Sequence, residues 1–324
     1  MGVVQQTGNL KTPFFLVLSM SVVEKIRSMM GTSVAITIVA PNADETTKKA
    51  LTLAFDEIRR IEDLMSIYRQ DSEVSVLNRD GFCGNASSEL IHVVKTASCY
   101  SELSGGVFDI TILPILDLWK EKSNDGISPT DVDLSRSLEL VNYRNIIVED
   151  RRLWFRKAGM RLTLAGIAKG YAVDRAIEAM QRAGIKHALV NAGGDIRALA
   201  GKAEEVPWRI AVRNPKDKSL SVSIVKVCDE AIATSGSYER HIGREMKVSH
   251  IVDARTGQPA QEMMSTTIIS KNGIDADALS TVVFLLGVEN GMDLVKKLSG
   301  VEALVMTNEG KVIKSSGYAK FESL

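Results

Sequence analysis

The sequence has few of the residues that mark several common classes of protein. Its 324 residues include three cysteines, Cys83, Cys99 and Cys228, and no two of them form a CxxC pair. This spacing argues against a disulfide framework and against a zinc site made of thiolates. The four histidines are too few and too scattered for a metal cluster. Forty basic residues balance forty acidic ones, so we expect no nucleic-acid partner and no binding to a charged membrane surface.

Several signature motifs are also missing. The chain has no GxxxxGK[ST] loop and no GxGxxG after a strand, which argues against the common phosphate-binding and dinucleotide-binding sites. It has no GxSxG motif of the kind that carries a hydrolase nucleophile. There is no internal repeat and no linker rich in proline, glycine or serine. We therefore expect a single compact domain, built as one lobe or as two.

The first 28 residues are set apart as an N-terminal segment, either a leader remnant or an extra element, and the main domain is expected over 29–324. An apolar run, PFFLVLSMSVV at 13–23, follows Lys11 and is similar to the core of a signal peptide. The run is too short to span a bilayer. No lipid-accepting cysteine and no convincing cleavage site stand directly after it.

The hydrophobic pattern predicts helices and strands in an irregular alternation. Helices are expected over 44–65, 87–106 and 169–182. Strands are expected over 32–40, 187–191, 208–213, 222–228 and 266–270, with a hairpin around 148–154. Because no regular βαβ rhythm is present, the expected fold class is α+β, with mixed or antiparallel sheets flanked by helices.

One further helix, predicted from the stretch IDADALSTVVF at 274–284, carries an acid and a hydroxyl on one face. Asp277 and Thr281 stand four residues apart, and an apolar run follows them as far as Gly287. One interpretation is capping, in which Asp275 or Asp277 accepts the free amide hydrogens of the first turn and Thr281 bonds a carbonyl behind it. The other is a pair of hard oxygen ligands for a divalent cation. The residues of this stretch alone leave both open.

Other segments are richer in glycine and polar residues than their apolar neighbours require. In LAGIAKGYAVD, Gly166 and Gly170 permit close approach of the backbone, and Lys169 offers a positive charge. GGVFDITILP indicates the end of a helix followed by a strand, with Asp109 forming a local turn. In NAGGDIR two glycines end a strand, either as a hairpin or bulge or as a ligand contact. His250 stands in a loop near Ser249 and Asp253, unlike the other histidines.

These segments, in this order, resemble the ApbE family of flavin transferases, which move FMN from FAD onto a Ser or Thr of another protein. The resemblance runs from about residue 30 to residue 320. The motifs that carry it are MGTSVAI, SIYRQDSEVSVLN, GVFDIT with the following P and LW, GIAKGYAVDRA, ALVNAGGDIR, ATSGSYER, SHIVDARTG and ADALST. Each motif alone is weak, but eight in family order are strong. The resemblance implies an ApbE-like domain and Mg²⁺-dependent transfer of FMN from FAD, with release of AMP.

The resemblance also assigns residues. It gives Mg²⁺ the side chains of Asp277 and Thr281 and the main-chain carbonyl of Gly166, which are hard oxygen ligands of the kind this ion prefers. His250 or Asp277 would accept the proton of the attacking hydroxyl. The FAD contacts carried over by the resemblance are Met30, Tyr68, Val107, Phe108, Asp109, Lys169 and Ile251, and Thr163 stands at a further contact position.

Two residues depart from the family pattern. Many members have Asp where this chain has Thr163, and Pro where it has Ala254. Loss of the acid puts full activity in doubt, so two alternatives stay open: a Mg²⁺-dependent FAD pyrophosphatase and a non-catalytic FAD-binding protein. By resemblance the acceptor is a subunit of an electron-transfer complex of the Nqr or Rnf type. The same resemblance implies the extracytoplasmic face of a membrane, while the missing lipid-anchoring cysteine leaves a cytoplasmic location open.

Overall fold

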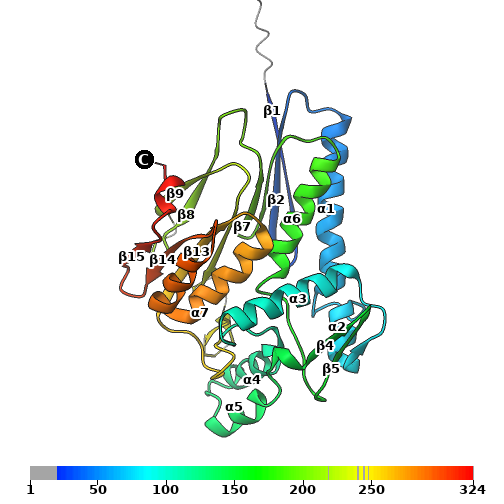
Figure 1. The fold of residues 1–324 in the computed structure, drawn as a ribbon, viewed down its shortest axis with the longest axis vertical. Helices are drawn as coiled ribbons and strands as arrows, with labels where there is room; N and C mark the ends of the chain where they lie inside the picture. The colour runs from blue at the N-terminus through cyan, green and yellow to red at the C-terminus, as the bar shows by residue number, and fades with distance from the viewer. Residues whose placement is uncertain (1–19, 218, 239–240, 244, 247, 324) are drawn as a thin grey trace, which may run out of the picture.

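The fold is built on one large antiparallel sheet (Figure 1). The computed structural model describes residues 20–217, 219–238, 241–243, 245–246 and 248–323. The sheet has the strand order β1-β2-β6-β7-β10-β13-β14-β15, and every neighbouring pair is antiparallel. Its strands are β1 (Ser21–Met29), β2 (Thr32–Ala40), β6 (His187–Ala192), β7 (Asp195–Leu199), β10 (Ala231–Gly236), β13 (Met263–Ser270), β14 (Glu302–Thr307) and β15 (Val312–Lys314). This confirms the α+β class.

The remaining elements surround this sheet. The helices are α1 (Glu45–Met65), α2 (Glu73–Asp80), α3 (Ser88–Leu103), α4 (Leu113–Asn124), α5 (Asp131–Leu138), α6 (Ala168–Arg182) and α7 (Gly273–Lys297), with 3-10 turns η1 (Ile110–Ile112), η2 (Tyr143–Asn145) and η3 (Tyr318–Lys320). Three small sheets are formed by β3 (Phe82–Cys83), β4 (Ile146–Glu149) and β5 (Arg152–Phe155), by β8 (Trp208–Arg213) and β9 (Ser221–Val227), and by β11 (His241–Ile242) and β12 (Val248–Ser249).

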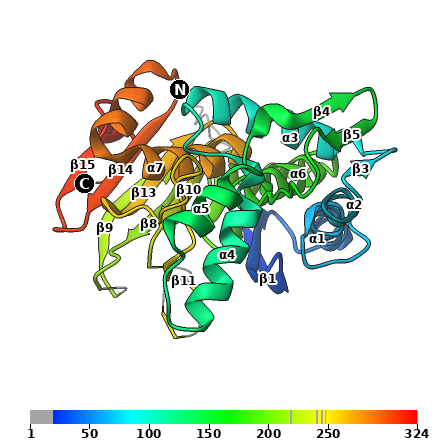
Figure 2. The same ribbon diagram turned by 90° about the horizontal axis from the view of Figure 1, so that it is seen from below.

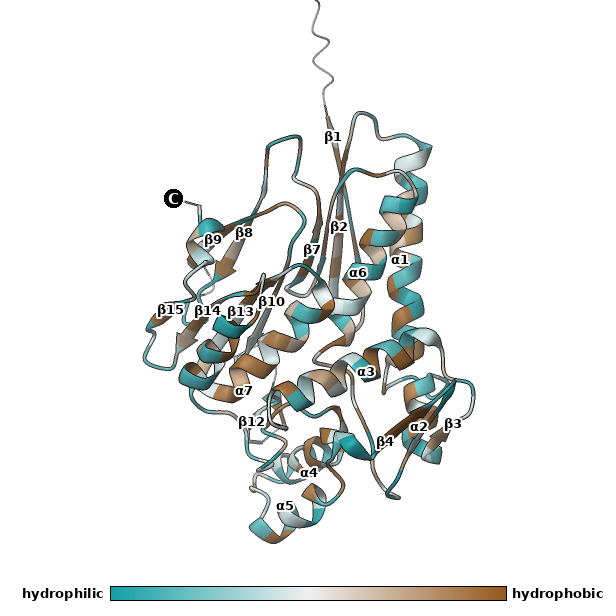
Figure 3. Ribbon diagram, viewed as in Figure 1, coloured by the Kyte–Doolittle hydropathy of each residue, from teal (hydrophilic) through white to brown (hydrophobic). Residues whose placement is uncertain are grey.

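The main sheet lies between two layers (Figures 1 and 2). Helices α1, α6 and α7 cover one face, where Val34, Ile36 and Ile38 of β2 are fully buried. The β8–β9 hairpin covers the other face, where Trp208 packs in a cluster with Val39. Figure 3 shows hydrophobic and hydrophilic residues alternating along α1, as expected for a helix with one buried face. Burial of these two apolar faces holds the sheet and the helices together.

Helix α7 is the core helix of the domain. It is long and apolar enough to cross a membrane, but 56% of its most apolar 18-residue window is buried inside the protein. It packs against α6, β10 and β13. Gly287, with φ 79° and ψ 178°, breaks the helical backbone as the sequence indicates, and the helix resumes after it. The first half of α7, which carries Asp277 and Thr281, is therefore anchored in the core.

Several expected elements are confirmed, and some are corrected. The strand over 32–40 and the helix after Asp44 have the predicted bounds. The strand expected after Gly106 is wrong: Asp109 caps η1, and α4 follows with Pro114 in its first turn. The β-branched residues there suggest a strand, but proline at this position favours a helix start. Strand β1 contains the boundary drawn at residue 28, and residues 13–19 of the apolar run lie outside the described residues.

Candidate functional site

The first turns of α6 and α7 cross with their backbones in contact. A Cβ atom at Gly170 would lie 2.1 Å from the carbonyl oxygen of Gly273, and one at Gly273 would lie 2.5 Å from the carbonyl oxygen of Gly170. Only glycine fits a crossing this close. The crossing brings together two segments about a hundred residues apart in the sequence. One is LAGIAKG, which leads into α6, and the other is ADALST in α7.

Asp277 lies at this crossing and is 3% exposed. Its Oδ2 accepts a hydrogen bond of 2.9 Å from the Gly170 N–H, and its Oδ1 lies 3.4 Å from Nζ of Lys169. The same ammonium group lies 2.6 Å from Oδ2 of Asp195, which is 5% exposed. Two buried carboxylates thus converge on one ammonium group. Lys169 balances part of the negative charge of the two carboxylates. Their oxygens are potential ligands for a cation.

The predicted cap interpretation of this helix is wrong in its detail. The N-cap residue of α7 is Asn272, which makes no side-chain cap bond. Asp275 accepts a 2.7 Å bond from the Tyr100 hydroxyl on α3 instead. Asp277 does bind a free amide hydrogen, but that of α6 rather than of its own helix. Sequence spacing shows which face a side chain is on, and not which helix it meets.

Gly166 and Thr281 lie next to each other beside this carboxylate. A Cβ atom at Gly166 would lie 3.3 Å from Oγ1 of Thr281 and 3.3 Å from the ring of Phe108. Oγ1 of Thr281 is 3.1 Å from Oγ of Ser235 on β10, and that oxygen is 2.7 Å from Oγ of Ser280. Gly166, Thr281 and Phe108 therefore lie in one cluster. Asp277 is one helical turn before Thr281.

The chemistry of this cluster suits Mg²⁺ rather than a softer metal. The described part of the chain contains no group of three His, Cys, Asp or Glu side chains that could hold a metal. Asp277, Thr281 and Gly166 offer one carboxylate, one hydroxyl and one main-chain carbonyl, all hard oxygen donors. Mg²⁺ is commonly bound by one or two carboxylates, with waters and substrate phosphates completing the shell. Asp277, Thr281 and Gly166 fit such an ion.

Three of the predicted flavin contacts, Val107, Phe108 and Asp109, belong to one buried segment. Val107 is fully buried and Phe108 nearly so. The carbonyl of Val107 accepts a 3.0 Å bond from the N–H of Ala254. This bond ties the segment to the loop that contains Ile251, which is also buried, and His250, which is half-buried. A proline at position 254 could not make the bond, so this departure from the family pattern has a structural use here.

Asp109, in this segment, and Thr163, whose N–H bonds the Ile110 carbonyl, already have partners inside the protein. Oδ1 of Asp109 accepts bonds of 2.8 and 2.7 Å from the N–H and hydroxyl of Thr111, and Oδ2 accepts a 2.7 Å bond from the Tyr143 N–H. Burial raises the pKa of this carboxyl. The N–H of Thr163 donates to the Ile110 carbonyl, and its hydroxyl accepts from the N–H of Ala165. Both residues shape the turn beside the cluster, and their contact with flavin stays a prediction.

Met30 and Tyr68 lie on turns at the end of the sheet and of α1. Met30 has φ 52° in the tight β1–β2 turn, and its N–H donates a 2.8 Å bond to Oε1 of Glu62. Tyr68 follows α1 by three residues, and 88% of its surface is exposed. The β6–β7 turn is at the same end of the sheet, because the N–H of Gly193 donates to the carbonyl of Ser33. An exposed aromatic ring here is available to stack on a planar ligand.

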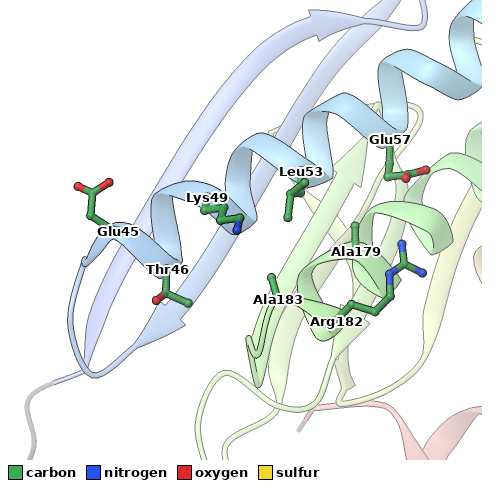
Figure 4. Close-up of a pocket in the computed structure, with 8 residues that line it drawn as sticks. All are labelled: Glu45, Thr46, Lys49, Leu53, Glu57, Ala179, Arg182 and Ala183. Carbon is green, nitrogen blue, oxygen red and sulfur yellow. The ribbon is translucent and has the colours of Figure 1, made fainter.

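A groove elsewhere on the molecule contains none of the predicted residues. It has a volume of about 480 Å³, lies between α1 and the far end of α6, and is shown in Figure 4. Its lining residues are Glu45, Thr46, Lys49, Leu53, Glu57, Ala179, Arg182 and Ala183. The predicted residues that the structure brings together lie instead at the α6–α7 crossing.

A family model described as the ApbE family matches residues 30–305 of this chain. The chain belongs to the ApbE family. A relative from Vibrio cholerae, named FAD:protein FMN transferase, is 31% identical over 305 residues, which cover 91% of each protein. A relative of the same name from Treponema pallidum is 28% identical over 311 residues, 89% of this chain and 85% of the relative.

Solved structures of ApbE proteins share this fold. The flavin transferase ApbE from Vibrio cholerae superposes with a TM-score of 0.82 at 30% identity, covering 94% of this chain and all of that one. The ApbE protein from Thermotoga maritima gives a TM-score of 0.85 at 28% identity, with the same coverage. The match covers 94% of this chain, so the family's fold is that of nearly the whole chain.

Three polar residues of the cluster at the α6–α7 crossing were not among the predicted ones. Asp195 pairs with Lys169, and the hydroxyls of Ser235 and Ser280 extend from Thr281. The signal for Asp195 was present, since an acid directly follows the paired glycines of NAGGDIR. Ser235 stands in the segment ATSGSYER. The antiparallel pairing of β10 with β13 and the packing of β10 on α7 are needed to show which hydroxyl of this segment faces inward.

Proposed function

We propose that this protein is an FAD:protein FMN transferase that depends on Mg²⁺. It transfers FMN from FAD to the hydroxyl of a Ser or Thr on an acceptor protein and releases AMP. Membership of the ApbE family supports the proposal, as do the names of relatives that align along most of the chain. The proposal assigns FAD as the substrate and Mg²⁺ as the cofactor.

The observation that carries the proposal is the convergence of Gly166, Lys169, Asp277 and Thr281 at the α6–α7 crossing. When bound there, Mg²⁺ would neutralise charge on the pyrophosphate of FAD and on the departing AMP. Lys169 adds a fixed positive charge at the same place, and Phe108 covers the cluster on one side. Val107, Ile251 and Tyr68 would enclose the rings of FAD, with Met30 at the adjacent turn.

The reaction needs a group that takes the proton of the acceptor hydroxyl. The hydroxyl oxygen attacks the phosphorus on the FMN side of FAD, forming a phosphoester bond. The bond from that phosphorus to the bridging oxygen breaks, and AMP leaves with its electron pair. Asp277 already accepts the Gly170 N–H, lies beside the Lys169 ammonium group and is assigned to the metal, so it is not free to take this proton. We therefore assign the base to His250, which is half-buried in the loop joined to Val107.

We further propose an electron-transfer subunit of the Nqr or Rnf type as the acceptor, at the extracytoplasmic face of a membrane. An exposed Ser or Thr of such a subunit must reach the cluster, and Tyr68 and the nearby turns are exposed on that side. Co-expression of the protein with a candidate acceptor, with and without an export signal, tests the compartment. Flavinylation only when both proteins are exported would support the assignment, and flavinylation of the cytoplasmic pair alone would contradict it.

The test of function is intact mass spectrometry of an acceptor incubated with the protein, FAD and Mg²⁺. We expect the mass of one FMN to be added to the acceptor, and no addition when the target Thr is changed to Ala. Asp277→Ala should lower the rate at least about a hundredfold, because it removes the only carboxylate assigned to the metal. AMP release without an acceptor adduct would instead indicate a pyrophosphatase, and FAD binding without AMP would indicate a binding protein.

A further inference from the structure

The first turns of α6 and α7 cap each other. Neither helix has a side-chain cap of its own, since the N-cap residues Ile167 and Asn272 make no such bond. Asp277 of α7 accepts the Gly170 N–H of α6. In return Asp174 of α6 accepts two amide hydrogens of α7, with Oδ1 2.7 Å from the Gly273 nitrogen and Oδ2 2.9 Å from the Ile274 nitrogen. Each carboxylate thus satisfies amide groups that would otherwise lack a partner in the helix.

Strand β7 fixes α6 through two ion pairs of opposite polarity. Asp195 lies 2.6 Å from Lys169, and Nε of Arg197 lies 3.4 Å from Oδ1 of Asp174. Asp195 and Arg197 are two residues apart on the strand, so they point to the same face. All four side chains are largely buried. Asp174 is therefore held from the sheet side while it holds the start of α7.

We propose that Asp174 is a positioning residue for Asp277, setting where the first turn of α7 sits on α6 and hence where the metal-binding carboxylate lies. The proposal rests on the proposed function of the cluster as a Mg²⁺ site. Asp174 does not itself belong to the assigned metal or FAD ligands. It acts through Gly273 and Ile274, which come one helical turn before Asp277 and Ala278.

The glycine crossing explains why a small displacement would matter. With no side chain between Gly170 and Gly273, the two backbones have no compressible layer between them. The position of α7 along α6 is then set by the reciprocal hydrogen bonds. Loss of the bonds to Asp174 allows the first turn of α7 to open, and Asp277 moves relative to Thr281 and Gly166. Residues that orient metal ligands typically change metal affinity by about 10- to 100-fold when mutated.

The first experiment compares wild type with Asp174→Asn. Asn keeps the shape of the side chain but replaces one acceptor oxygen by an NH₂ group that faces an N–H. We expect the amides of Gly273 and Ile274 to exchange with deuterium at least about tenfold faster, with little change in the strands of the sheet. We also expect the Mg²⁺ concentration that gives half-maximal FMN transfer to rise about tenfold. At saturating Mg²⁺, kcat should stay within about twofold of wild type.

The matched control is Asp293→Asn, which removes an exposed acid from the far end of α7. Asp293 forms an exposed ion pair with Lys296 and does not contact the α6–α7 crossing, so the variant's exchange and its Mg²⁺ requirement should equal those of wild type. If Asp174→Asn is folded and has the Mg²⁺ requirement of wild type, the proposal is wrong. A loss of kcat that saturating Mg²⁺ does not restore also overturns it.

A second variant guards against misfolding of the first. Arg197→Gln leaves Asp174 in place but removes the charge that holds it, so a rise of about threefold in the Mg²⁺ requirement is expected, in the same direction. An unchanged requirement in this variant counts against the proposal. If wild type transfers no FMN at all, the proposed function fails. Asp174 is then judged by amide exchange and by the rise in melting temperature on adding Mg²⁺, which should be smaller in the variant.

Discussion

Helix α6 makes two junctions that differ in nearly every respect. At its start it crosses α7 through paired glycines, with Lys169 between two buried carboxylates. At its end it faces α1 across the groove of Figure 4, where Ala179 and Ala183 lie between charged residues that are largely exposed. Both junctions carry acids and bases. The first has them buried and converging, while the second has them at the rim, where ion pairs contribute little.

Charge alone therefore does not mark the end of α6 that carries the predicted site residues. Exposed charges in the groove are solvated whether or not a ligand is present. Buried carboxylates at the crossing are retained at a cost in desolvation, which a bound cation can offset. A change of the same kind should therefore have a large effect at the crossing and a small one at the groove.

The largest difference is expected for added volume. Gly170→Ala places a methyl group 2.1 Å from the Gly273 carbonyl oxygen and 2.6 Å from Cβ of Asp277. An Ala in a helix is normally favourable, but here we expect the free energy of unfolding to fall by about 3 kcal/mol or more. Ala183→Ser at the groove should change it by less than about 0.5 kcal/mol. Urea unfolding of both variants measures this, and a Gly170→Ala protein as stable as wild type would refute the close crossing.

The next difference concerns a single positive charge. Lys169→Met removes the ammonium group that lies between Asp195 and Asp277. We expect a loss of about 2–3 kcal/mol in the free energy of unfolding when EDTA is present. Mg²⁺ should restore part of it, because the cation replaces the missing charge. Lys49→Met at the groove should lose less than about 0.5 kcal/mol and should not respond to Mg²⁺. Equal losses in the two variants would remove the distinction between the junctions.

The smallest effect is a pH dependence at the crossing. Burial raises the pKa of Asp174 to about 6 from a usual value near 4. Between about pH 4 and pH 6 the folded protein therefore binds more protons here than the unfolded chain. Stability contributed by this group is lost as pH rises through that range. The difference in unfolding free energy between wild type and Asp174→Asn should fall accordingly across this range.

Asp293 offers the opposite sign within the same helix. A hydrogen bond from Lys296 lowers the pKa of this exposed carboxyl. Its contribution is therefore present above its unfolded pKa and lost as pH falls. Asp293→Asn should show no decline between pH 4 and pH 6. If the difference in unfolding free energy between wild type and Asp174→Asn stays constant from pH 4 to pH 6, the burial assigned to Asp174 is contradicted.

Local structure could be predicted from the sequence wherever one short pattern decides it. Strand β2 and helix α1 follow from apolar periodicity, and Asp44 caps α1 as an acid in that position should. The segment after Gly106 could not be predicted correctly, because Ile110 and Ile112 favour a strand while Pro114 starts a helix. Helices α2 and α5 have only eight residues each and lie in polar stretches, so each presents too few apolar positions for a periodic pattern to stand out.

The candidate site shows the same limit at longer range. The pair Asp277 and Thr281 was visible as an i, i+4 spacing, and the family resemblance added Gly166. The bond from Gly170 to Asp277, and those from Gly273 and Ile274 to Asp174, join residues about a hundred positions apart. Such bonds depend on how two helices cross, which no local pattern specifies. Asp174 belongs to the motif GIAKGYAVDRA, but its bonds to the first turn of α7 become visible only in the fold.

A crystal structure of the protein with Mg²⁺ and FAD would test the proposed metal site at the α6–α7 crossing. We expect one ion bound by the Asp277 carboxylate, the Thr281 hydroxyl and the Gly166 carbonyl, next to the pyrophosphate of FAD. We also expect the groove between α1 and α6 to be empty. An ion bound without Asp277, or FAD bound in that groove, would contradict this proposal.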